Sequence, residues 1–161
     1  MTGQDDIKLI LPEDGRQSER ALAIRKGVGR LMITYGYTVL PEITLPTGRR
    51  ADLVCLSPKG LIWIIEIKSS VADYRADSKW QDYLIHCDEF SFATGPDVPP
   101  EIFPDETGLM VSDIYGGDII RPASTNKISP AARKSVYLAC ARTGAQRLHY
   151  LEDPGAHRGS N

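Results

Sequence analysis

The sequence lacks any long hydrophobic run and contains few cysteines. No apolar segment approaches the roughly 20 residues that a membrane-spanning helix needs, so no contact with a membrane is expected. The three cysteines, Cys55, Cys87 and Cys140, are far apart, which argues against a disulfide framework or a zinc site and favours a reducing, cytoplasmic setting. Residues 1–6 are acidic and polar, unlike a secretory signal.

The composition that remains is that of an ordinary globular protein. The chain has 161 residues, of which 42% are hydrophobic and 25% are charged. This length suits one domain with a sizeable core. We expect a flexible N-terminal tail over residues 1–13, a single domain over residues 14–151 and a flexible C-terminal tail over residues 152–161.

The net charge of −2 conceals an uneven distribution of basic residues. Residues 121–150 contain six Lys and Arg and no Asp or Glu, and residues 16–30 contain five Lys and Arg against one Glu. Charge segregated in this way can give an acidic protein one basic face that attracts a polyanion such as DNA. The alternative is two solvated helix faces, which charge alone favours.

Hydrophobic periodicity predicts the first helix and the order of the strands. Asp14, with Gln17, is the expected cap of a helix that ends at Gly36. Runs rich in β-branched and aromatic residues then predict strands over residues 37–45, 51–57, 61–68 and 90–94.

The remaining elements follow from helical spacing and turn residues. A second helix is expected to start at Asp77 or Ser78, with Trp80, Leu84 and Cys87 on its buried side. A small hairpin follows within residues 108–121, and a last helix starts at Ser129-Pro130 and is interrupted at Gly144. This order predicts an α/β fold with a central mixed β-sheet flanked by helices.

One hairpin of this sheet contains the candidate site. If Pro58-Lys59-Gly60 is a three-residue loop, glycine occupies the position that needs a positive φ. Counting back from the loop puts Asp52 directly opposite Glu66, and Lys68 on the same face as Glu66. A two-residue loop would instead place the two carboxylates on opposite faces.

Two adjacent carboxylates and an ammonium are a recognised arrangement for hydrolysis of phosphodiesters. The carboxylates repel each other unless a cation lies between them, and Mg²⁺ is held by one or two carboxylates and several waters. The metal lowers the pKa of a bound water, and Lys68 would orient or deprotonate that water. The alternative is a strand end that leaves the core, with Glu66 and Lys68 as a surface pair.

The chain resembles a known family over most of its length, about residues 16–150. The segments that carry the resemblance are "GRRADL", "EIKSS", "DYRADSKWQDYL", "CDEFSFA" and "GLMVSDIYG". They are similar to the MmcB family of bacterial DNA repair proteins. Asp52 followed by Glu66-Ile67-Lys68 resembles the PD-(D/E)xK nuclease superfamily, which implies a restriction-endonuclease-like core.

The resemblance also implies roles for individual residues. Asp52, Glu66 and the backbone carbonyl of Ile67 would bind Mg²⁺, with Mn²⁺ as the alternative ion, and Lys68 would be the catalytic lysine. Many members of the superfamily add a glutamate from the first helix. Lys26 stands near that position here, so Glu42, on the preceding strand, is the substitute to test.

Basic residues around this site are candidates for DNA contacts. Arg49 and Arg50 precede the site strand and could hold a scissile phosphate, although turn solvation explains them equally well. Lys79 follows the lysine strand. The full set of expected DNA-binding residues is Arg49, Arg50, Lys79, Lys26, Arg133 and Lys134.

These residues predict a metal-dependent DNA endonuclease that acts in DNA repair on damaged or branched DNA. The alternative is a non-catalytic nuclease-like module that binds DNA or recruits a partner. The incomplete ligand set favours this alternative, since the first helix offers no clear glutamate ligand. The residues do not distinguish a DNA substrate from an RNA substrate.

Overall fold

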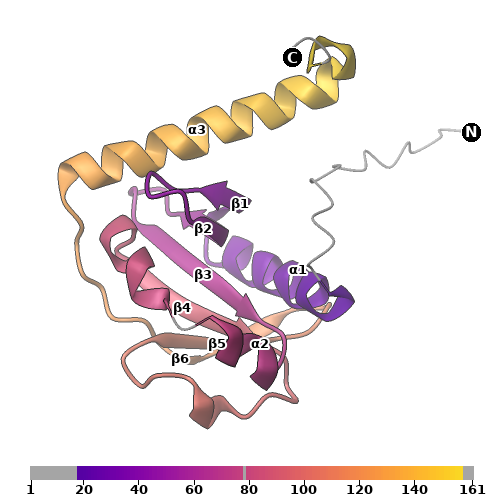
Figure 1. Cartoon of the computed structure of the whole chain (residues 1–161), viewed down its shortest axis with the longest axis vertical. Helices are drawn as coiled ribbons and strands as arrows, with labels where there is room; N and C mark the ends of the chain where they lie inside the picture. The colour runs from indigo at the N-terminus through magenta and orange to yellow at the C-terminus, as the bar shows by residue number, and fades with distance from the viewer. Residues whose placement is uncertain (1–17, 78, 158–161) are drawn as a thin grey trace, which may run out of the picture.

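The chain folds into a six-stranded mixed β-sheet with helices on both faces (Figure 1). This computed structural model describes residues 18–77 and 79–157. The strands are β1 (Thr38–Thr44), β2 (Arg50–Leu56), β3 (Ile62–Lys68), β4 (Glu89–Thr94), β5 (Gly108–Ser112) and β6 (Gly117–Arg121). The helices are α1 (Glu19–Thr34), α2 (Val71–Ala76) and α3 (Pro130–Glu152), with short 3₁₀ helices η1 (Trp80–His86), η2 (Pro100–Ile102) and η3 (Pro154–His157).

The strands lie in the sheet in sequence order, β1 to β6. β1, β2 and β3 form an antiparallel meander, β3, β4 and β5 are parallel, and β6 returns antiparallel to β5. The predicted α/β class and mixed sheet are therefore confirmed, and so is the hairpin within residues 108–121. None of the helices within the described residues is long and apolar enough to cross a membrane.

α1 covers one face of the sheet. Ile24, Val28 and Met32 of this helix are buried with Trp63 and Ile65 of β3. The predicted end at Gly36 is confirmed, since Gly36 has a φ of +82° and follows the last turn. The predicted cap, Asp14 with Gln17, lies outside the described residues, and the N-cap in the structure is Ser18, whose hydroxyl accepts a hydrogen bond from Ala21 N.

α2, η1 and α3 cover the other face, and here the second predicted helix was wrong. A helix already starts at Val71, because the side chain of Ser70 accepts a hydrogen bond from Asp73 N and acts as its N-cap. Residues 80–86 then form a 3₁₀ helix. Its period of three residues per turn turns Tyr83 toward the core and leaves Leu84, which we expected to be buried, 43% exposed.

The predicted interruption of the last helix at Gly144 was also wrong, since α3 is continuous from Pro130 to Glu152. A glycine inside a helix costs only about 1 kcal/mol relative to alanine. Packing outweighs that cost, because Val136 and Cys140 of α3 are buried in the core and a Cβ at position 144 would lie 3.8 Å from Leu40 of β1.

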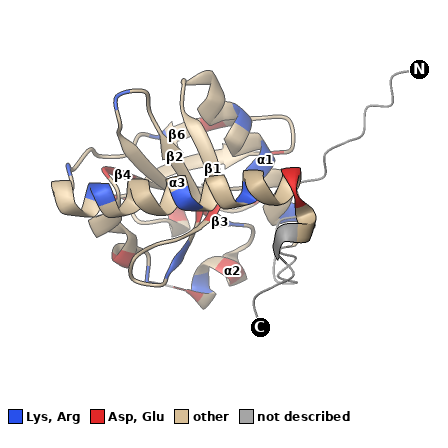
Figure 2. Ribbon diagram, turned by 90° about the horizontal axis from the view of Figure 1, so that it is seen from above, with Lys and Arg blue, Asp and Glu red and all other residues tan. Residues whose placement is uncertain are grey.

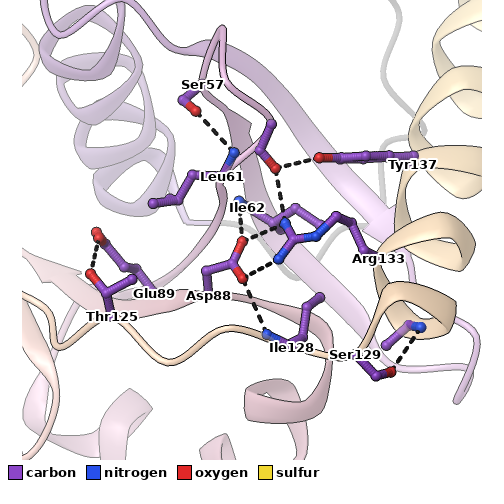
Figure 3. Close-up of polar contacts among 12 residues, drawn as sticks. Ser57, Leu61, Ile62, Asp88, Glu89, Thr125, Ile128, Ser129, Arg133 and Tyr137 are labelled. Carbon is purple, nitrogen blue, oxygen red and sulfur yellow. Dashed lines mark hydrogen bonds and ion pairs between the residues drawn. The ribbon is translucent and has the colours of Figure 1, made fainter.

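A partly buried ion pair holds the start of α3 against the sheet (Figure 3). The carboxylate of Asp88 accepts hydrogen bonds from both terminal nitrogens of Arg133, at 2.7 and 2.5 Å. It also accepts from Ile62 N on β3 at 2.8 Å and from Ile128 N at 3.2 Å. Burial acts to raise the pKa of Asp88, but these hydrogen bonds outweigh it and hold that pKa below its usual value.

Removal of the Arg133 guanidinium should therefore destabilise the fold. We expect Arg133→Met to lower the free energy of unfolding by about 3 kcal/mol, because it leaves the buried carboxylate of Asp88 without its counter-charge. Urea denaturation at pH 7 measures this change. Arg142→Met, at an exposed position of the same helix, is the matched control and should change stability by less than about 0.5 kcal/mol. Equal effects of the two substitutions would contradict a structural role for the ion pair.

Candidate active site

The turn between β2 and β3 has the length that the sequence predicted. Gly60 has a φ of +90°, and Ser57 N donates to Leu61 O across the base of the loop at 3.0 Å. The ladder then pairs Leu56 with Ile62 and continues to Leu53 with Ile65. The next position in this register places Asp52 opposite Glu66, as expected.

The two carboxylates take over the hydrogen bonding where the regular ladder ends. Glu66 Oε1 accepts from Asp52 N at 3.0 Å, and Asp52 Oδ2 accepts from Ile67 N at 2.8 Å. Each carboxylate therefore engages the backbone of the neighbouring strand with one of its oxygens. This reciprocal arrangement holds the two acidic groups side by side, and we call Asp52 and Glu66 the acid pair.

The acid pair holds a proton more tightly than isolated carboxyl groups do. Burial raises the pKa of Glu66 to about 8, and the charge of Asp52 adds to this effect. Burial likewise raises the pKa of Asp52, to about 6. The charge of Lys68 opposes both shifts. The acid pair therefore retains a proton more readily than two isolated carboxyl groups would, and a bound cation would displace that proton.

Lys68 lies on the same strand face as Glu66, and both residues are buried. Every residue of β3 is buried, with Glu66 6% and Lys68 7% exposed. The backbone carbonyl of Lys68 accepts a hydrogen bond from the Thr94 hydroxyl of β4 at 2.7 Å. The alternative in which Glu66 and Lys68 form a surface pair is therefore wrong, because β2 and β4 flank this end of β3.

The acid pair opens into a pocket of about 570 Å³. Its lining residues are Thr44, Gly48, Arg49, Arg50, Asp52, Glu66, Asp77 and Tyr83. Lys68 does not belong to this lining, so its charge reaches the carboxylates from within the protein. The pocket is large enough to admit a phosphodiester group, and the two arginines in its lining suit an anion.

Arg49 is already held by protein groups. Its guanidinium donates to Asp77 Oδ2 at 3.0 Å and to Asp82 Oδ2 at 3.2 Å, and it lies over the ring of Tyr83, 4.8 Å from the centroid. The guanidinium is therefore fixed at the rim of the pocket, with much of its charge neutralised. Arg50 is exposed beside it.

Glu42, the predicted substitute ligand, lies in the β1 position that faces Asp52. It is 7% exposed and has a φ of +51°, which interrupts the ladder between β1 and β2. Its Oε1 is 4.0 Å from Arg25 of α1, and its charge acts to raise the pKa of Asp52. Within the described residues no three His, Cys, Asp or Glu side chains are grouped to hold one metal ion, so Glu42 does not complete a three-carboxylate cluster with the acid pair.

The donors that are present fit Mg²⁺ or Mn²⁺ better than a softer metal. The acid pair supplies two carboxylates and no nitrogen or sulfur ligand, and one or two carboxylates with several waters are the usual protein share of a Mg²⁺ site. Burial is the largest cause of the raised pKa of each carboxyl group, and a divalent ion would offset that cost by pairing with the ionised carboxylates. A divalent ion would be held by Asp52 and Glu66, with the carbonyl of Ile67 as a further oxygen.

The other predicted DNA contacts are distributed over both sides of the sheet. Lys26 is exposed on α1, which covers the face opposite the acid pair, whereas Lys79 and Lys134 are exposed on the same side as the pair. Arg133 is engaged with Asp88, so we do not retain it as a DNA contact.

Tyr83 is a residue of the pocket that the sequence did not reveal. Its hydroxyl donates to Arg50 O at 3.1 Å and its ring supports Arg49, so it positions the rim of the pocket. The three-residue spacing of Trp80, Tyr83 and His86 was the available signal, but it indicates an inward face only if the segment is a 3₁₀ helix.

Comparison with known proteins identifies the family of this chain. The profile of the MmcB-like family, described as "DNA repair protein MmcB-like", matches residues 11–155. The chain belongs to the MmcB-like family. A role in DNA repair therefore follows from its membership. No curated protein matches the chain.

A solved structure of similar fold also matches the MmcB-like chain. It is the SPO1766 protein of unknown function from Silicibacter pomeroyi, with 38% sequence identity and a TM-score of 0.84. The match covers 90% of this chain and 99% of that chain. The two proteins therefore share a fold over most of this chain.

The proton held by the acid pair should make stability depend on pH. Because the folded protein raises the pKa of Glu66 from 4.5 to about 8, the free energy of unfolding should fall as pH rises through this window. Glu66→Gln keeps a side-chain oxygen that can accept the hydrogen bond from Asp52 N, and it removes the ionisable group. It should flatten this decline and stabilise the protein at pH 8 by on the order of 2 kcal/mol.

Urea denaturation of the two proteins between pH 5 and about 8.5 measures the difference. Asp118→Asn, which replaces an exposed carboxylate on β6, is the control and should leave the pH profile unchanged. A parallel decline in wild type and Glu66→Gln would show that Glu66 is not the group responsible.

Proposed function

We propose that this MmcB-like protein is a metal-dependent DNA endonuclease of the PD-(D/E)xK type, which hydrolyses phosphodiester bonds during DNA repair. The observation that carries the proposal is the acid pair: two neighbouring carboxyl groups with raised pKa values, with the buried Lys68 on the same strand and a pocket that contains two arginines beside them. The antiparallel meander followed by the parallel strand β4 is consistent with a restriction-endonuclease-like core.

Each residue of the site has a role in this proposal. Asp52 and Glu66 hold the cation, and their backbone hydrogen bonds fix the geometry of the two carboxylates. A bound divalent ion lowers the pKa of water and stabilises charge on a phosphoryl oxygen. Lys68, fixed next to the acid pair by its place in β3, favours the ionised state of the carboxylates and would orient the attacking water.

Basic residues on the same side of the sheet would hold the DNA backbone. Arg50 at the rim is the residue best placed for the phosphate in the pocket. Lys79 is exposed as well, whereas Lys134 follows Arg133, which contacts the Gly60 turn at the other end of the β2–β3 hairpin, so we do not count it among these contacts. Contacts of this kind position a duplex without reading its bases, so weak sequence preference is expected.

The alternative is a nuclease-like module that binds DNA or recruits a partner without cutting. Two observations favour it: the described residues form no three-carboxylate cluster, and Lys68 does not line the pocket. In that case the acid pair closes the β2–β3 ladder and has no catalytic role.

A cleavage assay separates these functions. We expect the purified protein with Mg²⁺ to cleave at least one of nicked, flapped, branched or single-stranded DNA. Asp52→Asn and Lys68→Met should each reduce the rate by at least about 100-fold, because each removes a group from the reacting centre. Glu101→Gln, an exposed substitution on η2, is the control and should cleave at the wild-type rate.

Binding and complementation identify the alternative. If wild type binds these DNA structures without cleaving any of them, and Glu66→Gln restores repair in cells that lack the protein, the non-catalytic module is correct. Loss of repair with Glu66→Gln, in a protein that folds normally, supports the nuclease.

A further inference from the structure

The outer face of α3 carries an apolar stripe that no other element of the described chain covers. α3 is the layer nearest the viewer when the molecule is seen from above (Figure 2). Val136 and Cys140 point from this helix into the core. On the outward side, Leu138 and Leu148 are 56% and 58% exposed. Large apolar side chains exposed together mark an interaction surface.

These residues follow the spacing of a helix–helix interface. Leu138, Ala141, Ala145 and Leu148 are all exposed and are separated by steps of three, four and three residues, the pattern of apolar positions in a coiled coil. We call these four residues the α3 seam. Lys134 and Glu152 extend the same stripe by one turn at each end and are also exposed.

The α3 seam is complementary to itself when a second copy is reversed. In an antiparallel pairing centred at the level of Thr143, Leu138 lies opposite Leu148 of the other copy and Ala141 lies opposite Ala145. The same register places Lys134 opposite Glu152, so each end of the seam meets the opposite charge. A surface whose two halves match in this way is what a two-fold symmetric interface requires.

We infer that the protein forms a homodimer through antiparallel pairing of α3 along this seam. The two alanines at the centre allow the helix backbones to approach closely, and the leucines on either side bury apolar surface. The charge pairs at the ends select the antiparallel over the parallel arrangement, since a parallel pairing would place Lys134 beside Lys134 and Glu152 beside Glu152. This inference does not depend on the proposed function.

The interface is short, so the dimer should dissociate on dilution. Sedimentation velocity of the full-length protein over a range of concentrations should show a monomer–dimer equilibrium. Leu138→Glu should raise the dissociation constant by at least about 100-fold, because two-fold symmetry buries the new charge twice. Leu84→Glu, at another exposed leucine outside the seam, is the matched control and should leave the equilibrium unchanged.

Charge exchange tests the register. Lys134→Glu alone and Glu152→Lys alone should each weaken the dimer by about tenfold, since each creates like-charge pairs at both ends. The double variant restores both pairs with their signs exchanged and should return the dissociation constant to within about threefold of wild type. Circular dichroism of each variant checks that the fold is intact.

Cross-linking tests the direction of the helices. A mixture of Leu138→Cys and Leu148→Cys proteins should form a disulfide-linked dimer on oxidation, and neither variant alone should do so efficiently. A monomer at all concentrations, a dimer that survives Leu138→Glu, or cross-linking of Leu138→Cys with itself would each overturn the inference. So would a seam that binds a different protein while this chain stays monomeric.

Discussion

The turn at Gly60 is the constraint on which both the acid pair and the position of α3 depend. Its positive φ closes a three-residue loop and thereby fixes which residues of β2 and β3 face each other. Its carbonyl oxygen also accepts hydrogen bonds from Arg133, at 3.0 Å, and from the hydroxyl of Tyr137, both on α3. Glycine suits the positive φ of this position, and a Cβ here would have to displace the Tyr137 hydroxyl that contacts the turn.

The register that this turn sets brings two like charges together at the far end of the same hairpin. Two carboxylates and an ammonium are placed at the end of a strand that is buried throughout its length. Buried carboxylates are stable only if they are protonated, hydrogen-bonded or paired with a cation. The acid pair uses the first two solutions, with backbone N–H groups on one oxygen of each carboxylate and a retained proton. The third solution, a divalent cation, is the one that would turn the acid pair into a reacting centre.

Elements whose signals are local could be predicted from the sequence, and elements that depend on packing could not. The register of the hairpin followed from one glycine and a period of two, because both act within a few residues. The segment that contains Tyr83 was misassigned, because apolar residues at positions 80, 84 and 87 fit an α-helix while positions 80, 83 and 86 fit the 3₁₀ helix that forms. Gly144 locally disfavours a helix, as glycine does in general. Burial of Val136 and Cys140 against the sheet outweighs this small cost, and α3 continues through the glycine.

The sequence by itself determined where the first four strands lie along the chain and that Asp52 pairs with Glu66, because loop length and side-chain alternation are properties of short segments. Only the tertiary structure decided which basic residues are engaged by distant parts of the chain. Arg133 donates to Asp88, which is 45 residues away in the sequence. Arg147 donates to the backbone carbonyls of Pro41 and Glu42, more than 100 residues away. Partners at such separations meet only when the sheet and α3 have packed, so a basic run in the sequence overstates the positive charge that the folded surface presents.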